Sequence, residues 1–307
     1  MVRPALQLYS VRDAHQPLVE LLPRIREAGY EGVEFASPPE RDCERLSSAL
    51  SDAGLEVVGM HVRLQELRDG RAEILESCRA LGCADVIVAH VSPSHFRTRS
   101  RVHALAQELD AQAAALAEAG VSLHYHNQCF EFQSVDVGPL VDAASAVCNP
   151  SPRPRLSGAG DAETLRRYRR MAGTAGERIL DALGGPPPAD SFEETGLATL
   201  LAETDDALAV EPDLGNVRAA GFDPERVLAR ATDRTRLVHV KDEFVSSAGP
   251  YPEERPAPLG SGDVDVEGAV AAADAAGATW VVMENDDPAT PLGPIANGRE
   301  VFESAGV

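Results

Sequence analysis

The feature that most constrains the fold of this chain is a regular alternation of short apolar runs with amphipathic stretches. Eight runs rich in apolar and β-branched residues recur along the sequence: Ala5–Tyr9, Gly32–Phe35, Val57–His61, Asp85–Ala89, Ser122–His126, Ala207–Glu211, Arg236–Val240 and Trp280–Glu284. Apolar residues at helical spacing lie between them, as in Leu18–Ala28, Arg71–Leu81, Val102–Ala119 and Val266–Ala276. Strictly alternating strands and helices predict a parallel sheet covered by helices.

Most of the predicted helices end at a glycine, as at Gly29, Gly54 and Gly120, and a strand follows two or three residues later. Glycine is the usual residue just past a helix because it tolerates the left-handed backbone conformation. Eight such units fit a closed (β/α)8 TIM barrel better than an open doubly wound sheet, and no GxGxxG follows the first strand. We therefore predict an α/β fold with residues 1–307 in a single TIM-barrel domain.

One interval breaks this rhythm, since 85 residues separate Ser122 from Ala207. The excess contains a predicted helix at Asp161–Leu183, and Ser191 and Glu194 have the spacing of a capping box that would begin the next helix. We predict a helical insertion over residues 134–190, after the fifth strand. This position is on the catalytic face of a barrel, where the insertion would serve as a lid or as a partner-docking arm.

The composition narrows the classes of partner and the compartment. The net charge of −21 and the pI of about 4.7 disfavour nucleic acid and membrane surfaces as partners. The five cysteines are odd in number and form no CxxC, which indicates a reducing compartment. No apolar run approaches the roughly 20 residues of a membrane span, and the first residues do not have the pattern of a signal peptide. We expect a cytoplasmic protein.

Polar side chains gather where the predicted strands end, which in a barrel is the catalytic face. Those that we select as site residues are Gln7, Glu34, His61, His90, His126, Glu131, Glu211, Asp213, Asn216, His239, Lys241 and Glu284. Carboxylates and imidazoles that converge from several strands indicate a metal site. A set of Glu131, Asp213, His239 and Glu284 would be rich in oxygen ligands and suited to Mn²⁺ or Mg²⁺, with His126 as the alternative fourth ligand.

Six segments, in order along nearly the whole chain, resemble the sugar phosphate isomerase/epimerase family of the xylose-isomerase-like TIM barrel superfamily. They are Ala5–Arg12, His124–Phe132, Glu211–Asp213, Leu237–Asp242, Leu259–Asp263 and Val281–Glu284. The resemblance implies a single Mn²⁺, Mg²⁺ or Co²⁺ held by Glu131, Asp213, His239 and Glu284. We expect Mn²⁺ first, with Mg²⁺, Co²⁺ or Zn²⁺ as alternatives. The chain departs from the family at Gln128, where relatives often have a second histidine, at Asn216, where many have an aromatic residue, and in the insertion.

Lys241 is the only lysine in a chain whose other 27 basic residues are arginine. It lies two residues beyond His239, so both side chains are predicted to point into the same barrel mouth. An ammonium can lose a proton where a guanidinium cannot, which favours a proton shuttle or a donor to a developing enolate oxygen. The alternative is a salt bridge with Asp242 or Glu211.

The remaining site residues are predicted to contact substrate: Gln7, Glu34, His61, His90, His126, Glu211 and Asn216. For His61 and His90 the alternative is a hydrogen-bonded histidine at the barrel rim, and for Glu34 it is the anchoring of a loop.

The predicted reaction is enolisation of a small sugar-like or cyclitol-like carbonyl compound, with Glu131 and Glu284 as base and acid. Return of the proton gives an isomerase or an epimerase. Loss of a β-substituent gives the alternative, a lyase of the inosose-dehydratase or keto-glycoside-cleaving kind. Two further alternatives are a non-catalytic partner subunit and a DNA-repair endonuclease, the latter disfavoured by the acidity of the chain. A homo-oligomer is left open.

Overall fold

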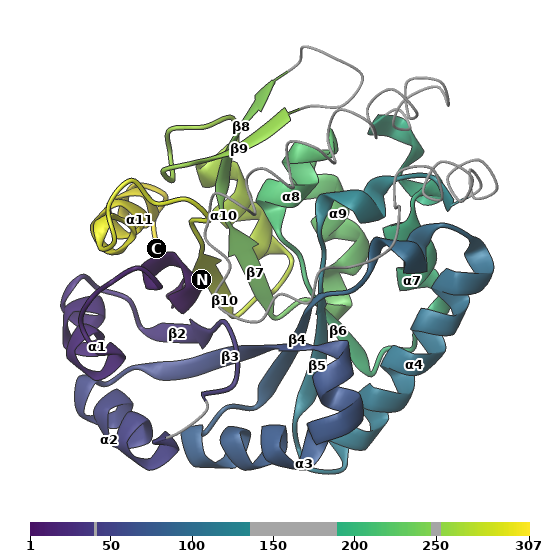
Figure 1. Cartoon of the computed structure of the whole chain (residues 1–307). Coiled ribbons are helices and arrows are strands. Elements are labelled where there is room, and N and C mark those ends of the chain that lie inside the picture. The colour runs from purple at the N-terminus through teal and green to yellow at the C-terminus, as the bar shows by residue number, and fades with distance from the viewer. Residues whose placement is uncertain (40–41, 136–188, 247–252) are drawn as a thin grey trace, which may run out of the picture.

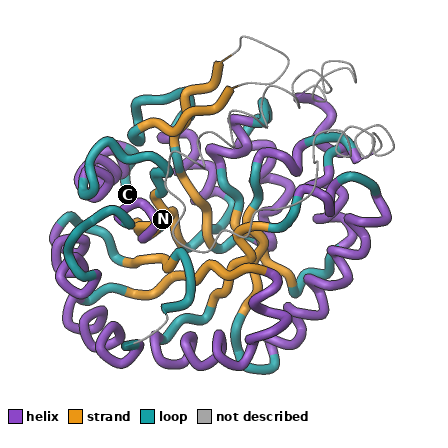
Figure 2. Tube along the Cα trace, viewed as in Figure 1, coloured by secondary structure: helices purple, strands orange, loops and turns teal. Residues whose placement is uncertain are grey.

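Eight parallel strands form one sheet that curves into a nearly closed barrel. The computed structural model describes residues 1–39, 42–135, 189–246 and 253–307. The strand order is β6-β5-β4-β3-β2-β1-β10-β7. Isolated parallel bridges pair Val210 with Thr235 and Asp213 with His239, and they join the two ends of the sheet. Figure 1 and Figure 2 show the ring of strands inside a layer of helices. The predicted TIM barrel is confirmed.

The barrel strands lie where the apolar runs predicted them, with small shifts at the ends. Their bounds are β1 Arg3–Gln7, β2 Gly32–Phe35, β3 Glu56–Arg63, β4 Asp85–His90, β5 Ser122–His126, β6 Leu208–Glu211, β7 Leu237–Val240 and β10 Trp280–Met283. The largest difference is at the first strand, which ends at Gln7 because Leu8–Val11 turn into a short 3-10 helix, η1.

The helices pack their apolar stripes against the outer face of the strands, which explains the spacing seen in the sequence. The bounds are α1 Leu18–Glu27, α2 Cys43–Ala53, α3 Leu64–Leu81, α4 Arg99–Ala117, α7 Gly196–Glu203, α8 Leu214–Ala219, α9 Pro224–Ala231, α10 Val266–Ala275 and α11 Gly293–Ser304. Four further 3-10 helices are η2 Pro93–Phe96, η3 Cys129–Phe132, η5 Ala189–Glu194 and η6 Thr232–Arg234. None of the helices in the described ranges has the length and apolarity that crossing a bilayer requires.

Local details at the helix ends agree with the sequence at one point and differ at another. Gly54 is the C-cap of α2 and has positive φ, as predicted, and Gly82 has the same role and conformation at the end of α3. The predicted capping box at Ser191 is wrong: the N-cap of α7 is Thr195, whose Oγ1 accepts a hydrogen bond from the backbone N–H of Ala198 at 3.1 Å.

The predicted insertion, including the helix at Asp161–Leu183, falls mostly on residues 136–188, which lie outside the described residues. The chain on either side of it is described. Ser134 and Thr195 form an antiparallel bridge, so the two flanks lie side by side just beyond the carboxyl end of β5.

A β-hairpin that the sequence patterns did not predict follows β7. Its strands are β8 Asp242–Ser246 and β9 Glu253–Ala257, and they pair antiparallel at the top edge of the view in Figure 1. The buried carboxylate of Asp242 accepts hydrogen bonds from the backbone N–H groups of Gly262 at 2.7 Å and Val264 at 3.0 Å. Asp242 therefore fixes the connection from the hairpin to α10.

The inside of the barrel has an apolar floor. Six buried side chains form it: Ala5, Val58, Ile87, Leu237, Trp280 and Val282. Gly32 has no room for a side chain, since a Cβ there would lie 2.3 Å from Cγ1 of Val58. The floor closes the amino-terminal end of the barrel and leaves the polar residues at the carboxyl ends of the strands.

Candidate active site and metal centre

A cavity of about 540 Å³ opens at the carboxyl ends of the barrel strands. Its walls consist of Tyr9, Ala36, His61, Ala89, His90, His126, Gln128, Lys241, Glu284 and Asp286. A larger hollow of about 1010 Å³ lies between α2 and α3, on the outside of the barrel. The titratable groups of the barrel converge on the smaller cavity, so it is the candidate active site.

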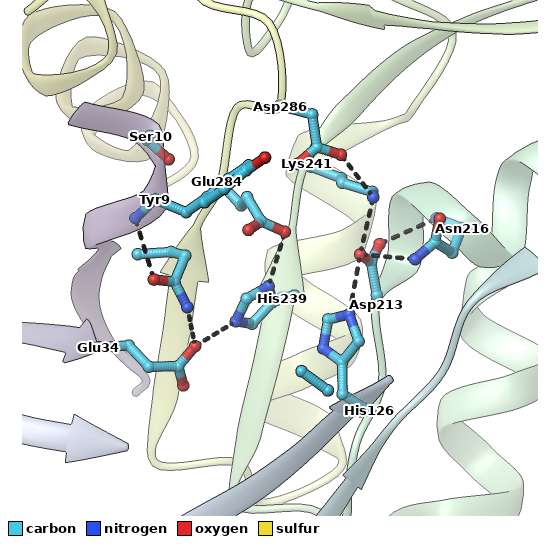
Figure 3. A network of polar contacts seen from close by, with 12 residues as sticks. Tyr9, Ser10, Glu34, His126, Asp213, Asn216, His239, Lys241, Glu284 and Asp286 are labelled. Carbon is cyan, nitrogen blue, oxygen red and sulfur yellow. Dashed lines mark hydrogen bonds and ion pairs between the residues drawn. The ribbon is translucent and has the colours of Figure 1, made fainter. Parts of the chain in front are cut away.

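Four side chains at this cavity form a group that could hold one cation: His126, Asp213, His239 and Glu284. Each offers a ligand atom, and these four atoms all lie within 4.8 Å of one another. His126 ends β5 and His239 belongs to β7, while Asp213 and Glu284 directly follow β6 and β10. The group is thus built from the ends of four neighbouring strands, and Figure 3 shows it from close by.

Glu131, the predicted fourth ligand, is not a member of this group. It lies in η3, where its carboxylate accepts hydrogen bonds from the hydroxyl of Tyr125 at 2.6 Å and from the backbone N–H of Gln128. The side chain is fully buried and is not part of the cavity wall. Burial raises the pKa of Glu131 to about 8. The structure brings His126, the alternative ligand, to the place expected for Glu131.

Neighbouring amide side chains hold Asp213 in place. Asn216 donates from its backbone N–H to Oδ1 and from its side-chain amide to Oδ2 of Asp213, each at 2.9 Å. Oδ1 of Asn127 accepts a hydrogen bond from the backbone N–H of Asp213 at 3.0 Å, and Nδ2 of Asn127 donates one to the backbone carbonyl of Asp213 at 3.3 Å. Asn216, which was predicted to contact substrate, is buried, lies outside the cavity wall and orients Asp213.

Lys241 lines the cavity and is surrounded by carboxylates. Its Nζ lies 3.1 Å from Oδ2 of Asp213, 3.0 Å from Oδ2 of Asp286 and 3.8 Å from Glu243. Burial alone would lower the pKa of Lys241, but Asp213 and Asp286 raise it well above its ordinary value. The salt bridge that we held open as an alternative is present, with partners other than the predicted Asp242 and Glu211.

The two imidazoles of the group each have a second nitrogen that faces a buried carboxylate. Nδ1 of His126 lies 3.0 Å from Oε2 of Glu211, and Nε2 of His239 lies 2.7 Å from Oε1 of Glu34. Figure 3 shows His239 between Glu34 and Glu284. Burial lowers the pKa of His239, but Glu211 and Glu34 outweigh it and raise that pKa well above its ordinary value. These contacts fix the planes of both rings.

The same two carboxylates also face His61. Its Nε2 lies 2.8 Å from Oε1 of Glu34 and 3.3 Å from Oε2 of Glu211. Burial lowers the pKa of His61, yet the two carboxylates raise it to about 10. The amide of Gln7 donates to Oε1 of Glu34 at 2.5 Å and so completes the network.

The pKa values of Glu284 and Asp213 are lowered, whereas those of the two histidines above are raised. Burial raises the pKa of Glu284, but the hydrogen bond from His239 and the nearby charges lower it to about 2. In the same way the ammonium of Lys241 and the ring of His126 hold the pKa of Asp213 well below its usual range, against the effect of burial. Both groups are therefore carboxylates at neutral pH, as ligands must be.

The predicted substrate contacts divide into two sets. His61, His90 and His126 are part of the cavity wall, whereas Gln7, Glu34, Glu211 and Asn216 are buried outside it. The wall also includes Gln128 and two residues that we had not selected, Tyr9 and Asp286. Asp286 could have been selected from the sequence, because it lies only two residues beyond Glu284, just past the end of a predicted strand.

Structure comparisons find the same fold over nearly the whole chain. A sugar phosphate isomerase/epimerase from Parabacteroides distasonis is 15% identical with a TM-score of 0.69, and the match covers 99% of this chain and 95% of that one. The probable 3-DHS dehydratase AsbF from Bacillus anthracis is 11% identical with a TM-score of 0.62, over 98% and 99% of the two chains. A family 2 AP endonuclease from Brucella melitensis is 14% identical with a TM-score of 0.60, over 97% and 96%.

No family model and no curated protein matches the sequence. The structural matches nonetheless confirm the predicted resemblance at the level of the fold, which this chain shares with sugar phosphate isomerase/epimerase and xylose isomerase-like proteins. These neighbours include proteins described as an isomerase/epimerase, a dehydratase and an endonuclease. The choice among such activities therefore depends on the site of this chain.

Proposed function

We propose that this protein is a divalent-metal-dependent isomerase or epimerase that acts on a sugar or keto-sugar through an enediolate. The observation that carries the proposal is the convergence of His126, Asp213, His239 and Glu284 within 4.8 Å at one cavity. Two carboxylates and two neutral imidazoles can hold one dication.

The donor set indicates which cations fit. Imidazole ligands suit Zn²⁺ and Co²⁺, and carboxylates suit Mn²⁺ and Mg²⁺. With His126 in the place that we had predicted for Glu131, the set has two nitrogen ligands rather than one, which favours Mn²⁺, Co²⁺ or Zn²⁺ over Mg²⁺. A cation bound there would polarise a substrate carbonyl and make the adjacent carbon more acidic.

Glu284 is the carboxylate that we assign to proton removal. It is one of two carboxylates in the cavity wall, and the interactions with His239 and Lys241 keep it ionised. A substrate carbon seated against Glu284 would lose its proton to this carboxylate. The second carboxylate of the wall, Asp286, is paired with Lys241 at 3.0 Å.

The second proton-transfer group, predicted at Glu131, is better assigned to His90. His90 ends β4, which lies four strands from β10 in both directions around the barrel, so it faces Glu284 across the cavity. The ring of Phe130 packs edge-on against the ring of His90, with 6.0 Å between the ring centroids. Burial, assisted by Arg63, lowers the pKa of His90, which leaves the ring neutral near pH 7. Groups on opposite sides of a substrate are what epimerisation requires.

Lys241 would donate a hydrogen bond to the oxygen on which negative charge develops. Its ammonium lines the cavity, and its raised pKa suits a permanent donor rather than a shuttle that gives up its proton. Asp213 and Asp286, at 3.1 and 3.0 Å, hold the ammonium at the cavity wall.

A metal-dependent lyase is the second candidate, because loss of a β-substituent starts from the same enolate. The dehydratase among the structural neighbours keeps this reading open. An endonuclease is disfavoured by the net charge of −21. A non-catalytic partner subunit would have no reason to keep four converging ligands. We propose a cytoplasmic location because the odd number of cysteines and the lack of a CxxC indicate a reducing compartment.

The experiment that tests the proposal follows C–H exchange. The protein is loaded with Mn²⁺ or Zn²⁺ and incubated in D₂O with ketoses, inososes and keto-glycosides, and NMR records the protons next to the carbonyl. Exchange that requires metal and is lost in Glu284→Gln supports enolisation, and the products separate isomerase, epimerase and lyase. Failure of the wild-type protein to bind any of these metals would refute the proposal and favour the partner subunit.

A further inference from the structure

The cavity group shares its two histidines with a second set of side chains that could also hold a cation. This second set is His61, His126, Glu211 and His239. The two sets face opposite sides of the same two imidazoles. A neutral imidazole has one N–H and one lone pair, so His126 and His239 cannot serve a cation on both sides at once. The structure must therefore favour one side.

We call the side of Asp213 and Glu284 the front and the side of Glu34 and Glu211 the rear. The distances show which nitrogen of each ring faces each side. In His126, Nε2 lies 3.5 Å from Oδ2 of Asp213, while Nδ1 lies 3.0 Å from Oε2 of Glu211. In His239, Nδ1 lies 3.3 Å from Oε2 of Glu284, while Nε2 lies 2.7 Å from Oε1 of Glu34 and 3.5 Å from Oε2 of Glu211. The two shortest of these five distances, 2.7 and 3.0 Å, are both to rear carboxylates, and the two distances to front carboxylates are longer, at 3.3 and 3.5 Å.

Burial separates the two sides as well. Glu34 and Glu211 are fully buried and are absent from the cavity wall, whereas Glu284 is part of that wall. The front carboxylate Glu284 therefore faces the cavity, whereas the two rear carboxylates do not, although His61 of the second set also lines the wall. The rear carboxylates instead have the distances and the burial of hydrogen-bond acceptors.

The backbone makes room for this arrangement. Gly59 lies on β3 beside Glu34, and a Cβ there would be 2.7 Å from Oε2 of Glu34. Gln7 holds the other oxygen of Glu34 at 2.5 Å. Residues of two further strands, Gly59 of β3 and Gln7 of β1, thus fix the position of Glu34 beside His239.

We infer that Glu211 and Glu34 are positioning residues, which accept the N–H of His126 and His239 and so turn the lone pairs of both rings toward a single cation at the front. This inference rests on the proposed metal-dependent function and adds the roles of two residues to it. Outer-shell acceptors of this kind fix the tautomer and the orientation of a ligating imidazole, and their loss typically weakens metal binding by about 10- to 100-fold.

The test compares Glu211→Gln and Glu34→Gln with Glu131→Gln, a matched control that is equally buried but belongs to neither set. Calorimetry gives the affinity and stoichiometry for Mn²⁺, and the visible spectrum of the Co²⁺ protein reports the ligand geometry. We expect one cation per chain in every variant, an affinity about 10- to 100-fold lower in Glu211→Gln and Glu34→Gln, and no change in Glu131→Gln.

Several outcomes would overturn the inference while the proposed function stands. They are two cations per wild-type chain, complete loss of metal in Glu211→Gln, or an unchanged affinity in both rear variants. Wild-type protein that binds no metal would instead refute the proposed function itself. As a check that needs no variant, ¹⁵N NMR of the Zn²⁺ protein should find the ring proton on Nδ1 of His126 and on Nε2 of His239. Protons on the opposite nitrogens would also refute it.

Discussion

The inner surface of the barrel consists of two layers that differ in chemistry although the same strands build them. The floor is apolar, with Ala5, Leu237 and Val282 among its members, and two residues further along the chain from these lie Gln7, His239 and Glu284. Inward-facing positions alternate along a strand, so this step of two residues moves from one layer to the next. The comparison suggests that the floor provides stability and that the polar layer provides chemistry.

The polar layer has an energetic cost that the floor does not. Glu34, Glu211, Asp213 and Glu284 are all buried, and burial of carboxylates is unfavourable unless they are paired. In the structure His61, His126, His239 and Lys241 supply the opposing charge. A bound dication would take over part of this task, so we expect metal to raise the stability of the protein.

The strongest test of the comparison is removal of a ligand from the polar layer. Asp213→Ala removes an oxygen ligand and a charge, so the Mn²⁺ affinity should fall by more than the roughly 100-fold that outer-shell changes cost. The metal-dependent rise in melting temperature should disappear with it. Calorimetry and thermal unfolding with and without Mn²⁺ measure both effects. Asp223→Ala, at an exposed residue just before α9, is the control: its Mn²⁺ affinity and its metal-dependent rise in melting temperature should match the wild type, although loss of the hydrogen bond from the backbone N–H of Glu225 lowers the melting temperature itself.

A second test separates metal binding from proton transfer within the same layer. His90→Gln removes a general acid–base group, which typically contributes 10²- to 10⁴-fold to a rate, so kcat or the D₂O exchange rate should fall about that far. The Mn²⁺ affinity should stay the same because His90 belongs to neither set of ligands. His95→Gln changes another histidine after β4 that is not in the cavity wall, and should leave the rate unchanged. A normal rate in His90→Gln would mean that another residue is the second proton-transfer group.

The third test addresses the floor. Ile87 is fully buried among the floor residues, and Ile→Ala substitutions in cores cost about 2–5 kcal/mol of unfolding free energy. We expect Ile87→Ala to lose stability in that range by urea unfolding while its Mn²⁺ affinity, measured under folding conditions, stays within about twofold. If the affinity fell as far as in Asp213→Ala, the two layers would not be separable in the way described here.

The sequence predicted the floor and the strands better than it predicted the polar layer. β2 and β5 have the bounds that the apolar runs indicated, because burial on both faces of a parallel strand leaves a strong local pattern. The polar layer depends on which residues follow a strand end. At β6, β7 and β10 the chain leaves the strand within two residues of Asp213, His239 and Glu284, and these three come together as expected.

Glu131 shows why the rest could not be predicted. It lies five residues beyond the last residue of β5, and in between the chain turns into η3, whose direction is set by hydrogen bonds rather than by an apolar pattern. The roles of Glu34 and Glu211 were also out of reach, because they depend on which nitrogen of each imidazole faces them. That choice involves β2, β5, β6 and β7 together, and no local spacing records it.

The smallest expected effect concerns the pH dependence that Glu131 itself confers. Its pKa is raised by burial from 4.5 to about 8, so between these pH values the folded carboxyl holds a proton that the unfolded one has lost. The folded state then binds more protons, and stability falls as pH rises, by about 1.4 kcal/mol per pH unit for one proton. The contribution is complete below pH 4.5 and is gone above about pH 8. Glu131→Gln cannot titrate, so its unfolding free energy relative to the wild type should rise between pH 5 and pH 7, as urea unfolding at each pH would measure. A pH-independent difference would mean that the carboxylate is ionised in the folded protein, and Glu131 would again be a candidate for the polar layer.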